Sequence, residues 1–150
     1  MGGLERRVEA EGQAPRVLVA LAEPGFRRAV LELLTEDGVP VLGGVTTGSG
    51  AVTAAMAPDP ERPDVVVVGG RLGGHLPVWD VIRQIRDAVP EVGAVALLDD
   101  AEGPAAARCR RAGAAVVLDR AGNPAALLSA VRLATAGRPL ATRSLDEARR

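Results

Sequence analysis

The sequence predicts an α/β fold in which one parallel sheet of five strands lies between two layers of helices. Three observations predict it. Short apolar runs alternate with segments whose apolar residues recur at helical spacing, and the alternation repeats five times in 150 residues. The run PDVVVVGG at residues 63–70 is apolar without interruption, which is typical of a strand covered on both faces. The connections between runs are short, as in sheets built from successive strand–helix units.

The composition supports a single domain and excludes several classes of function. The chain is 47% hydrophobic and contains only two aromatic residues, Phe26 and Trp79, so the core is expected to consist of Val, Leu and Ala. The net charge of −1 predicts no general attraction to nucleic acid. All 18 basic residues are arginines, which excludes lysine-based catalysis, and the single cysteine, Cys109, excludes an internal disulfide or a cysteine metal cluster. No apolar stretch approaches the roughly 18 residues of a membrane span, and residues 1–14 are too polar for a secretory signal, so we expect a cytoplasmic protein.

The first half of the chain is expected to form three strands and two helices. Pro24 suits the first turn of the first helix, Asp37-Gly38 ends that helix, and Pro58 ends the second. The expected order is strand 16–21, a helix from residue 24 to the Asp37-Gly38 stop, strand 39–45, helix 51–57 and strand 65–68.

The second half continues the pattern with three helices and two strands. Pro90 ends the first of these helices, and Asn123-Pro124 is a typical start of the last one, which Gly137 ends. The expected order is helix 81–88, strand 95–98, helix 104–112, strand 115–118 and a helix from residue 124 to Gly137. Five such units favour the flavodoxin-like strand order 2-1-3-4-5 in a three-layer sandwich. We expect residues 1–14 to be a flexible tail, 15–138 the domain, and 139–150 the start of a linker or helical extension.

Residues about 15 to 140 resemble the receiver domain of bacterial response regulators. The stretches that carry the resemblance are RVLVALAEPGFRRAVLELL, RPDVVVV with the helix that ends IRQIRDAVPEV, and RRAGAAVVLDRAGNPAALLSAVRLATAGRPL. The last stretch resembles the end of receivers that carry a LuxR/NarL-type helix-turn-helix domain. The resemblance implies a role in two-component signalling, and it implies a phosphotransfer site at the carboxyl ends of the strands.

The chain departs from the receiver pattern at every reactive position. An active receiver needs an acidic pair for Mg²⁺, an acceptor Asp, a Thr or Ser, and a Lys, because a carboxylate nucleophile and a cation carry the chemistry. The acidic pair aligns with Leu21 and Ala22, the acceptor with Gly69, the Thr or Ser with Leu98, and the Lys with Arg120. We therefore interpret the domain as a degenerate receiver with no catalytic residue, no cofactor and no metal.

Charged residues surround these degenerate positions. The rim is expected to consist of Glu23, Gly70, Arg71, Asp99 and Asp119. With Asp100, the rim acids could bind Mg²⁺. The interpretation that we favour is that these acids cap helices or pair with the two arginines. In particular, Arg120 could fill the acidic pocket and pair with Glu23 or Asp99, which would imitate a neutralised state without phosphate.

Three hypotheses of function follow, and none is enzymatic. The first is a phosphorylation-independent receiver of an atypical response regulator that controls transcription, acting as a homodimer and contacting DNA only through a C-terminal domain outside this chain. The second is a module that senses a small metabolite at the empty pocket beside Gly69-Gly70, lined by Leu21, Ala22 and Leu98. The third is a stand-alone adaptor that binds another protein. No membrane partner is expected.

Overall fold

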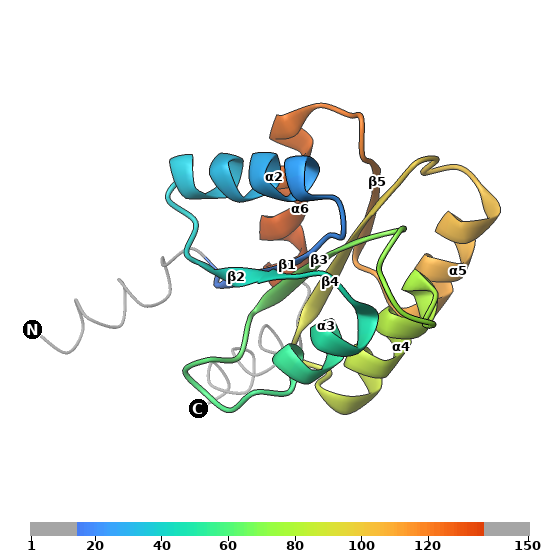
Figure 1. The fold of residues 1–150 in the computed structure, drawn as a ribbon, viewed down its shortest axis with the longest axis horizontal. Helices are drawn as coiled ribbons and strands as arrows, with labels where there is room; N and C mark the ends of the chain where they lie inside the picture. The colour runs from blue at the N-terminus through green and yellow to red at the C-terminus, as the bar shows by residue number, and fades with distance from the viewer. Residues whose placement is uncertain (1–14, 137–150) are drawn as a thin grey trace, which may run out of the picture.

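The computed structural model describes residues 15–136, which form one five-stranded parallel sheet in the order β2-β1-β3-β4-β5 (Figure 1). The predicted α/β fold and the predicted strand order are therefore confirmed. The elements are β1 (Val17–Ala20), α2 (Pro24–Glu36), β2 (Val41–Val45), α3 (Gly48–Ala55), β3 (Val65–Gly69), α4 (Val78–Ala88), β4 (Gly93–Leu98), α5 (Pro104–Ala112), β5 (Val116–Asp119) and α6 (Pro124–Ala136).

The central strand β3 explains the continuous run of valines. Val65 and Val67 belong to the core beneath α2 and α6, whereas Val66 and Val68 belong to the core beneath α3, α4 and α5. All four side chains are fully buried. Because successive strand residues point to opposite faces, a strand with a helical layer on each face needs an apolar residue at every position.

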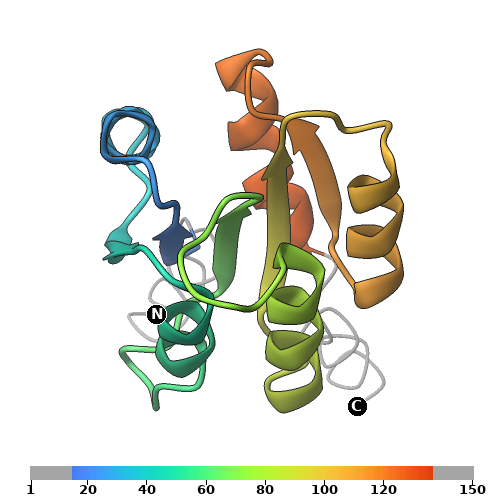
Figure 2. The same cartoon turned by 45° about the vertical axis from the view of Figure 1, so that its right-hand side comes forward.

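The two helical layers are packed differently. On one face of the sheet, α4 packs closely against both α3 and α5. On the other face, few residues of α2 come close to residues of α6. Figure 2 shows α2 nearly end-on while α6 is seen from the side, so the two helices are not parallel. Near its C-terminal end α6 lies close to the sheet, because a Cβ at Gly93 would stand only 2.8 Å from the carbonyl oxygen of Ala134. In this layer, therefore, α6 lies against the sheet near its C-terminal end, while α2 and α6 are not packed against each other.

Strand β2 is shorter than predicted. Residues 39–45 were expected to be extended, but the Val39 N–H donates to the Leu34 carbonyl at 2.9 Å and so completes the turn after α2. Pro40 has no N–H to donate to the sheet. The strand therefore begins at Val41.

Helix α3 begins earlier than predicted. Thr47 is its N-cap, and the Thr47 hydroxyl oxygen accepts a hydrogen bond from the Gly50 N–H at 3.0 Å. This cap draws residues 48–50 into the helix, although the glycines there favour a loop. The other changed boundaries differ by a few residues, with α4 beginning at Val78, β4 at Gly93 and β5 at Val116.

The predicted tail at residues 1–14 and the predicted extension at 139–150 lie outside the described residues. Between residues 15 and 136, none of the helices is both long enough and apolar enough to cross a membrane.

Candidate functional site

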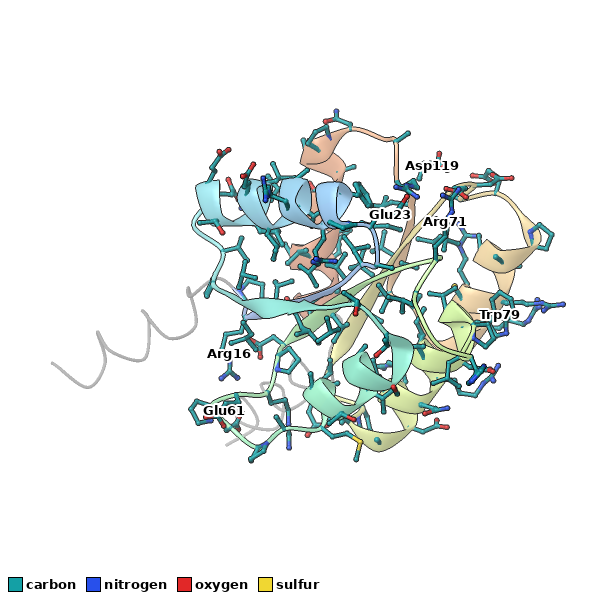
Figure 3. The ribbon with its side chains drawn as sticks, in the orientation of Figure 1. Arg16, Glu23, Glu61, Arg71, Trp79 and Asp119 are labelled. Carbon is teal, nitrogen blue, oxygen red and sulfur yellow. The ribbon has the colours of Figure 1, made fainter. Side chains whose placement is uncertain are left out.

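The loops that follow β1, β3, β4 and β5 meet at one end of the sheet. In Figure 3 the labelled side chains of Glu23, Arg71 and Asp119 gather at this end, while Arg16 and Glu61 lie at the opposite end. This is the edge where parallel α/β sheets place their sites. All ten residues predicted to form the site or its rim belong to these strand ends and loops.

The sheet itself positions the first residues of these loops. The Gly70 N–H donates to the Leu97 carbonyl at 3.1 Å, and the Arg120 N–H donates to the Leu98 carbonyl at 2.7 Å. Each bond continues the pairing of parallel strands one residue beyond the strand end. The side chains that start here therefore have fixed points of attachment.

Leu21 occupies the space beside Gly69. A Cβ added at Gly69 would lie 2.6 Å from Leu21 Cδ2, a separation that real Cβ atoms essentially never show. The Leu21 side chain is buried, with 3% of its surface exposed. A side chain at position 69 must therefore displace Leu21, which stands at a position predicted to carry a carboxylate in an active receiver.

Leu98 fills the neighbouring space in the same way. A Cβ at Gly70 would lie 3.1 Å from Leu98 Cδ2, and Leu98 is also buried. The cavity that remains beside Leu21, Ala22 and Gly69 has a volume of about 10 Å³, which is about the space of one water molecule. Leu21 thus fills the part of the expected pocket next to Gly69, whereas a hollow of about 230 Å³ lies on the side of Gly70 and Leu98.

We call the two buried leucines, Leu21 and Leu98, the apolar plug. Next to the plug lies a network of two arginines and two carboxylates, which we call the charge network (Glu23, Arg71, Asp99 and Arg120). Arg120 lies 2.5 Å from Glu23 Oε1 and 3.7 Å from Asp99 Oδ1. Arg71 lies 2.6 Å from Asp99 Oδ2 and 3.6 Å from Glu23 Oε2. Each arginine thus bridges the loop after β1 to the loop after β4, and the four formal charges cancel.

Arg120 is the more enclosed of the two arginines. Its guanidinium carbon lies 4.5 Å from the centroid of the Phe26 ring, in the arrangement of a cation–π contact. Its side chain is 23% exposed, compared with 61% for Arg71. The Arg120 guanidinium therefore contacts the Phe26 ring and also pairs with the carboxylates of Glu23 and Asp99. These contacts restrict the orientation of the side chain.

The electrostatics favour the charged form of the more exposed arginine. A hydrogen bond to Asp99, the charge of Asp99 and the charge of Glu23 raise the pKa of Arg71 above its usual value. Water screens ion pairs with this exposure, so each contributes little to the stability of the fold. The network consequently serves to orient the loops more than to stabilise the fold.

The other acids of this edge accept hydrogen bonds from backbone N–H groups of the loop before α5. Asp119 Oδ1 accepts from the Ala101 N–H at 2.7 Å, and Asp100 Oδ1 accepts from the Glu102 N–H at 2.9 Å. Within residues 15–136 no three His, Cys, Asp or Glu side chains form a group suited to a metal ion. Glu23 and Asp99 pair with the two arginines, as the favoured interpretation predicted, but the acids do not cap helices, because the N-caps of α2 and α5 have no side-chain hydrogen bond. The Mg²⁺ interpretation gains no support from this geometry.

Two residues of the site were missed in the sequence. Phe26 carries the Arg120 guanidinium on its ring, and Arg27 donates to the carbonyl oxygens of Leu21 at 2.9 Å and of Ala22 at 3.4 Å. A signal for Arg27 existed, because a basic residue in the first turn of a helix opposes the helix dipole. Its place there is explained by the two carbonyl groups that it binds.

Comparison with known proteins establishes the fold. No protein-family model matches the sequence, and no curated protein of similar sequence was found. Among solved structures, the signal receiver domain of a response regulator NarL from Mycobacterium tuberculosis superposes with a TM-score of 0.73 at 24% identity, covering 84% of this chain and 99% of that one. A LuxR-family two-component response regulator from Aurantimonas sp. SI85-9A1 superposes with a TM-score of 0.73 at 22% identity, covering 91% of this chain and 99% of that one.

A third similar structure is described with a metal ion in its active site cleft. It is the receiver domain of a sensor histidine kinase from Pseudomonas aeruginosa with a coordinated magnesium ion, and it superposes with a TM-score of 0.72 at 22% identity, covering 83% of this chain and 99% of that one. At such identities the likeness establishes that this chain has the fold of receiver domains. What it does with that fold must be argued from its own residues.

Proposed function

We propose that this chain is a regulatory receiver module that works without phosphorylation, within a response regulator that controls transcription. The observation that carries the proposal is the plug at the carboxyl end of β3, where Gly69 replaces the acceptor and Leu21 fills the space that an acceptor side chain needs. The fold shared with response-regulator receivers supports the regulatory part of the proposal.

The charge network supports the independence from phosphate. In an active receiver, a phosphoryl group and a metal ion change the charge balance among the loops at the strand ends. Here the loops after β1, β3, β4 and β5 are bridged by side chains of the protein alone. We infer that this arrangement holds one conformation of the loops permanently, so that output depends on contacts with other proteins.

The proposed contacts include a second copy of the chain, in a homodimer, and DNA through a separate C-terminal domain. No catalytic step is assigned to the module.

Phosphorylation by a small donor tests the proposal. The protein is incubated with acetyl phosphate and Mg²⁺ and its intact mass is measured, with an active receiver domain treated in parallel to verify the reagents. The expected result is an unmodified mass for this chain and a phosphorylated mass for the active domain. Covalent transfer to any residue of the charge network or to its neighbours would refute the independence from phosphate.

Ligand sensing on the Gly70 and Leu98 side of the expected pocket is a second candidate. A hollow of about 230 Å³ adjoins the plug and is lined in part by Arg71, Trp79, Leu98 and Asp99. Its test is a screen of small metabolites by the fluorescence of Trp79, the only tryptophan. Saturable quenching that is lost in Arg71→Ala, which keeps the tryptophan, would support this candidate, and the absence of any saturable response would remove it.

A further inference from the structure

The open layer between α2 and α6 contains a hollow lined by side chains of both helices. Its volume is about 480 Å³, within the range of sites that bind ligands or chain segments. Both helices contribute small side chains to its lining, Ala29 from α2 and Ala126 from α6. Its apolar lining is supplied by Phe26, Val30, Leu33, Leu97, Leu118 and Leu127.

The rim of this groove is acidic. Glu32 and Glu36 stand four residues apart on α2, both line the groove, and neither forms an ion pair with any residue between 15 and 136. Arg120, which also lines the groove, pairs with Glu23, and Arg132 on α6 pairs with Asp37 at 3.0 Å. The groove is therefore complementary to an occupant with apolar side chains and positive charge.

The segment that follows α6 has this chemistry. Residues 137–150 read GRPLATRSLDEARR, with four arginines against two acids, and Leu140 and Leu145 lie on either side of Arg143. The segment at the other end of the chain has the opposite balance, because residues 1–14 contain three glutamates and two arginines. Charge complementarity therefore favours the C-terminal segment.

The geometry allows this segment to reach the groove. Leu127 lies nine residues before Ala136 on α6, which corresponds to about 14 Å along the helix axis. The seven residues from 137 to 143 can span up to about 23 Å when extended. Arg143 can thus return to the level of Leu127, whereas Leu140, four residues beyond Ala136, can span about 13 Å and would meet the lining nearer to the end of α6.

We propose that residues 137–150 bind in the groove between α2 and α6, with Leu140 and Leu145 on the apolar lining and Arg143 beside Glu32 and Glu36. The occupant would then touch the Phe26 ring, whose face carries Arg120 of the charge network. Binding of the segment and the conformation of the charge network would be coupled through this ring. The proposal does not depend on whether the chain is phosphorylated.

Disulfide trapping in the full chain tests the proposal. The groove variant carries Ala29→Cys with Thr142→Cys, which places a thiol on the groove and another on the segment while every charge is kept. The matched control variant carries Thr35→Cys with Thr142→Cys, because Thr35 is an exposed residue of the same helix that does not line the groove. Native Cys109 is buried and stays out of the reaction. Circular dichroism verifies that each variant is folded.

The expected result is an intramolecular disulfide that forms about tenfold or more faster in the groove variant than in the control variant, at a rate independent of protein concentration. Adding Glu32→Arg with Glu36→Arg should abolish this preference, and further adding Arg143→Glu with Arg149→Glu should restore it. Equal rates for the two variants would overturn the proposal. So would disulfides that form only between chains, which would identify a second copy as the occupant, or a preference that survives the charge reversal of α2.

Discussion

The contact between Leu21 and the backbone of Gly69 can be tested by adding a single methyl group. Gly69→Ala places a Cβ 2.6 Å from Leu21 Cδ2, and the cavity of about 10 Å³ beside them leaves Leu21 little room to move away. Overpacking of this kind costs about 1–3 kcal/mol. It is offset in part by the roughly 0.4–1 kcal/mol that an alanine gains by restricting the unfolded chain. We expect a net loss of about 1 kcal/mol in the free energy of unfolding.

A double-mutant cycle identifies Leu21 as the cause. Leu21→Ala alone should cost about 2–5 kcal/mol, because it empties a buried site. In the double variant the new methyl group enters the space that Leu21 has left. The cost of the double variant should therefore be smaller than the sum of the single costs by about 1 kcal/mol or more.

The assay is urea unfolding followed by circular dichroism. Gly25→Ala serves as the control, because a Cβ at Gly25 would meet nothing within 4 Å and the change lies in the first turn of α2. The control should be neutral or slightly stabilising. If Gly69→Ala behaves like this control, or if the two costs add within about 0.5 kcal/mol, Leu21 does not block position 69.

Two further predictions concern charge. Arg120→Ala should lower the free energy of unfolding by about 1 kcal/mol, because it removes the ion pairs with the carboxylate partners and the Phe26 contact. When unfolding is measured in urea, this loss should be smaller in about 1 M NaCl, where surface charges are screened. A loss that does not depend on salt would contradict the electrostatic explanation. Burial raises the pKa of Cys109 to about 11, and the chain contains no Tyr and no Lys, so Cys109 is the only side chain that titrates between about pH 9 and 11. The thiol loses its proton first in the unfolded chain. Its contribution to the free energy of unfolding should therefore be fully present below about pH 8.5 and be lost as the pH rises through 11. This alkaline loss of stability should be absent in Cys109→Ala. The same fall in that variant would show that the thiol is not its cause.

Much of the fold could be predicted because local signals and global pattern agree. The valines of β3 are typical of a doubly covered strand, and Asn123-Pro124 marked the start of α6 at the residue where the helix begins. Boundaries were missed where a side chain or a tertiary bond decides them. The Thr47 hydroxyl begins α3, and the Val39 N–H closes the turn after α2 instead of joining β2.

The sequence predicted which residues come together at the site, but not the directions in which their side chains point. Strand order and register brought Glu23, Arg71, Asp99 and Arg120 together, which the alternation of strands and helices implies. The filling of the pocket by Leu21 depends on the direction of one side chain, which spacing in the sequence does not determine. The open groove between α2 and α6 likewise depends on how the two helices lie on the twisted sheet.

The central claim is that the phosphorylation site of the receiver fold is closed in this chain and replaced by the charge network. Titration with beryllofluoride and Mg²⁺, followed by the backbone amide resonances of Ala22, Gly69 and Gly70 and by the side-chain N–H resonances of Arg120, tests this claim most directly. The account predicts no saturable change in any of these resonances, with Arg120 held in place by Glu23 throughout. Saturable shifts of the three amides, together with release of Arg120, would contradict it.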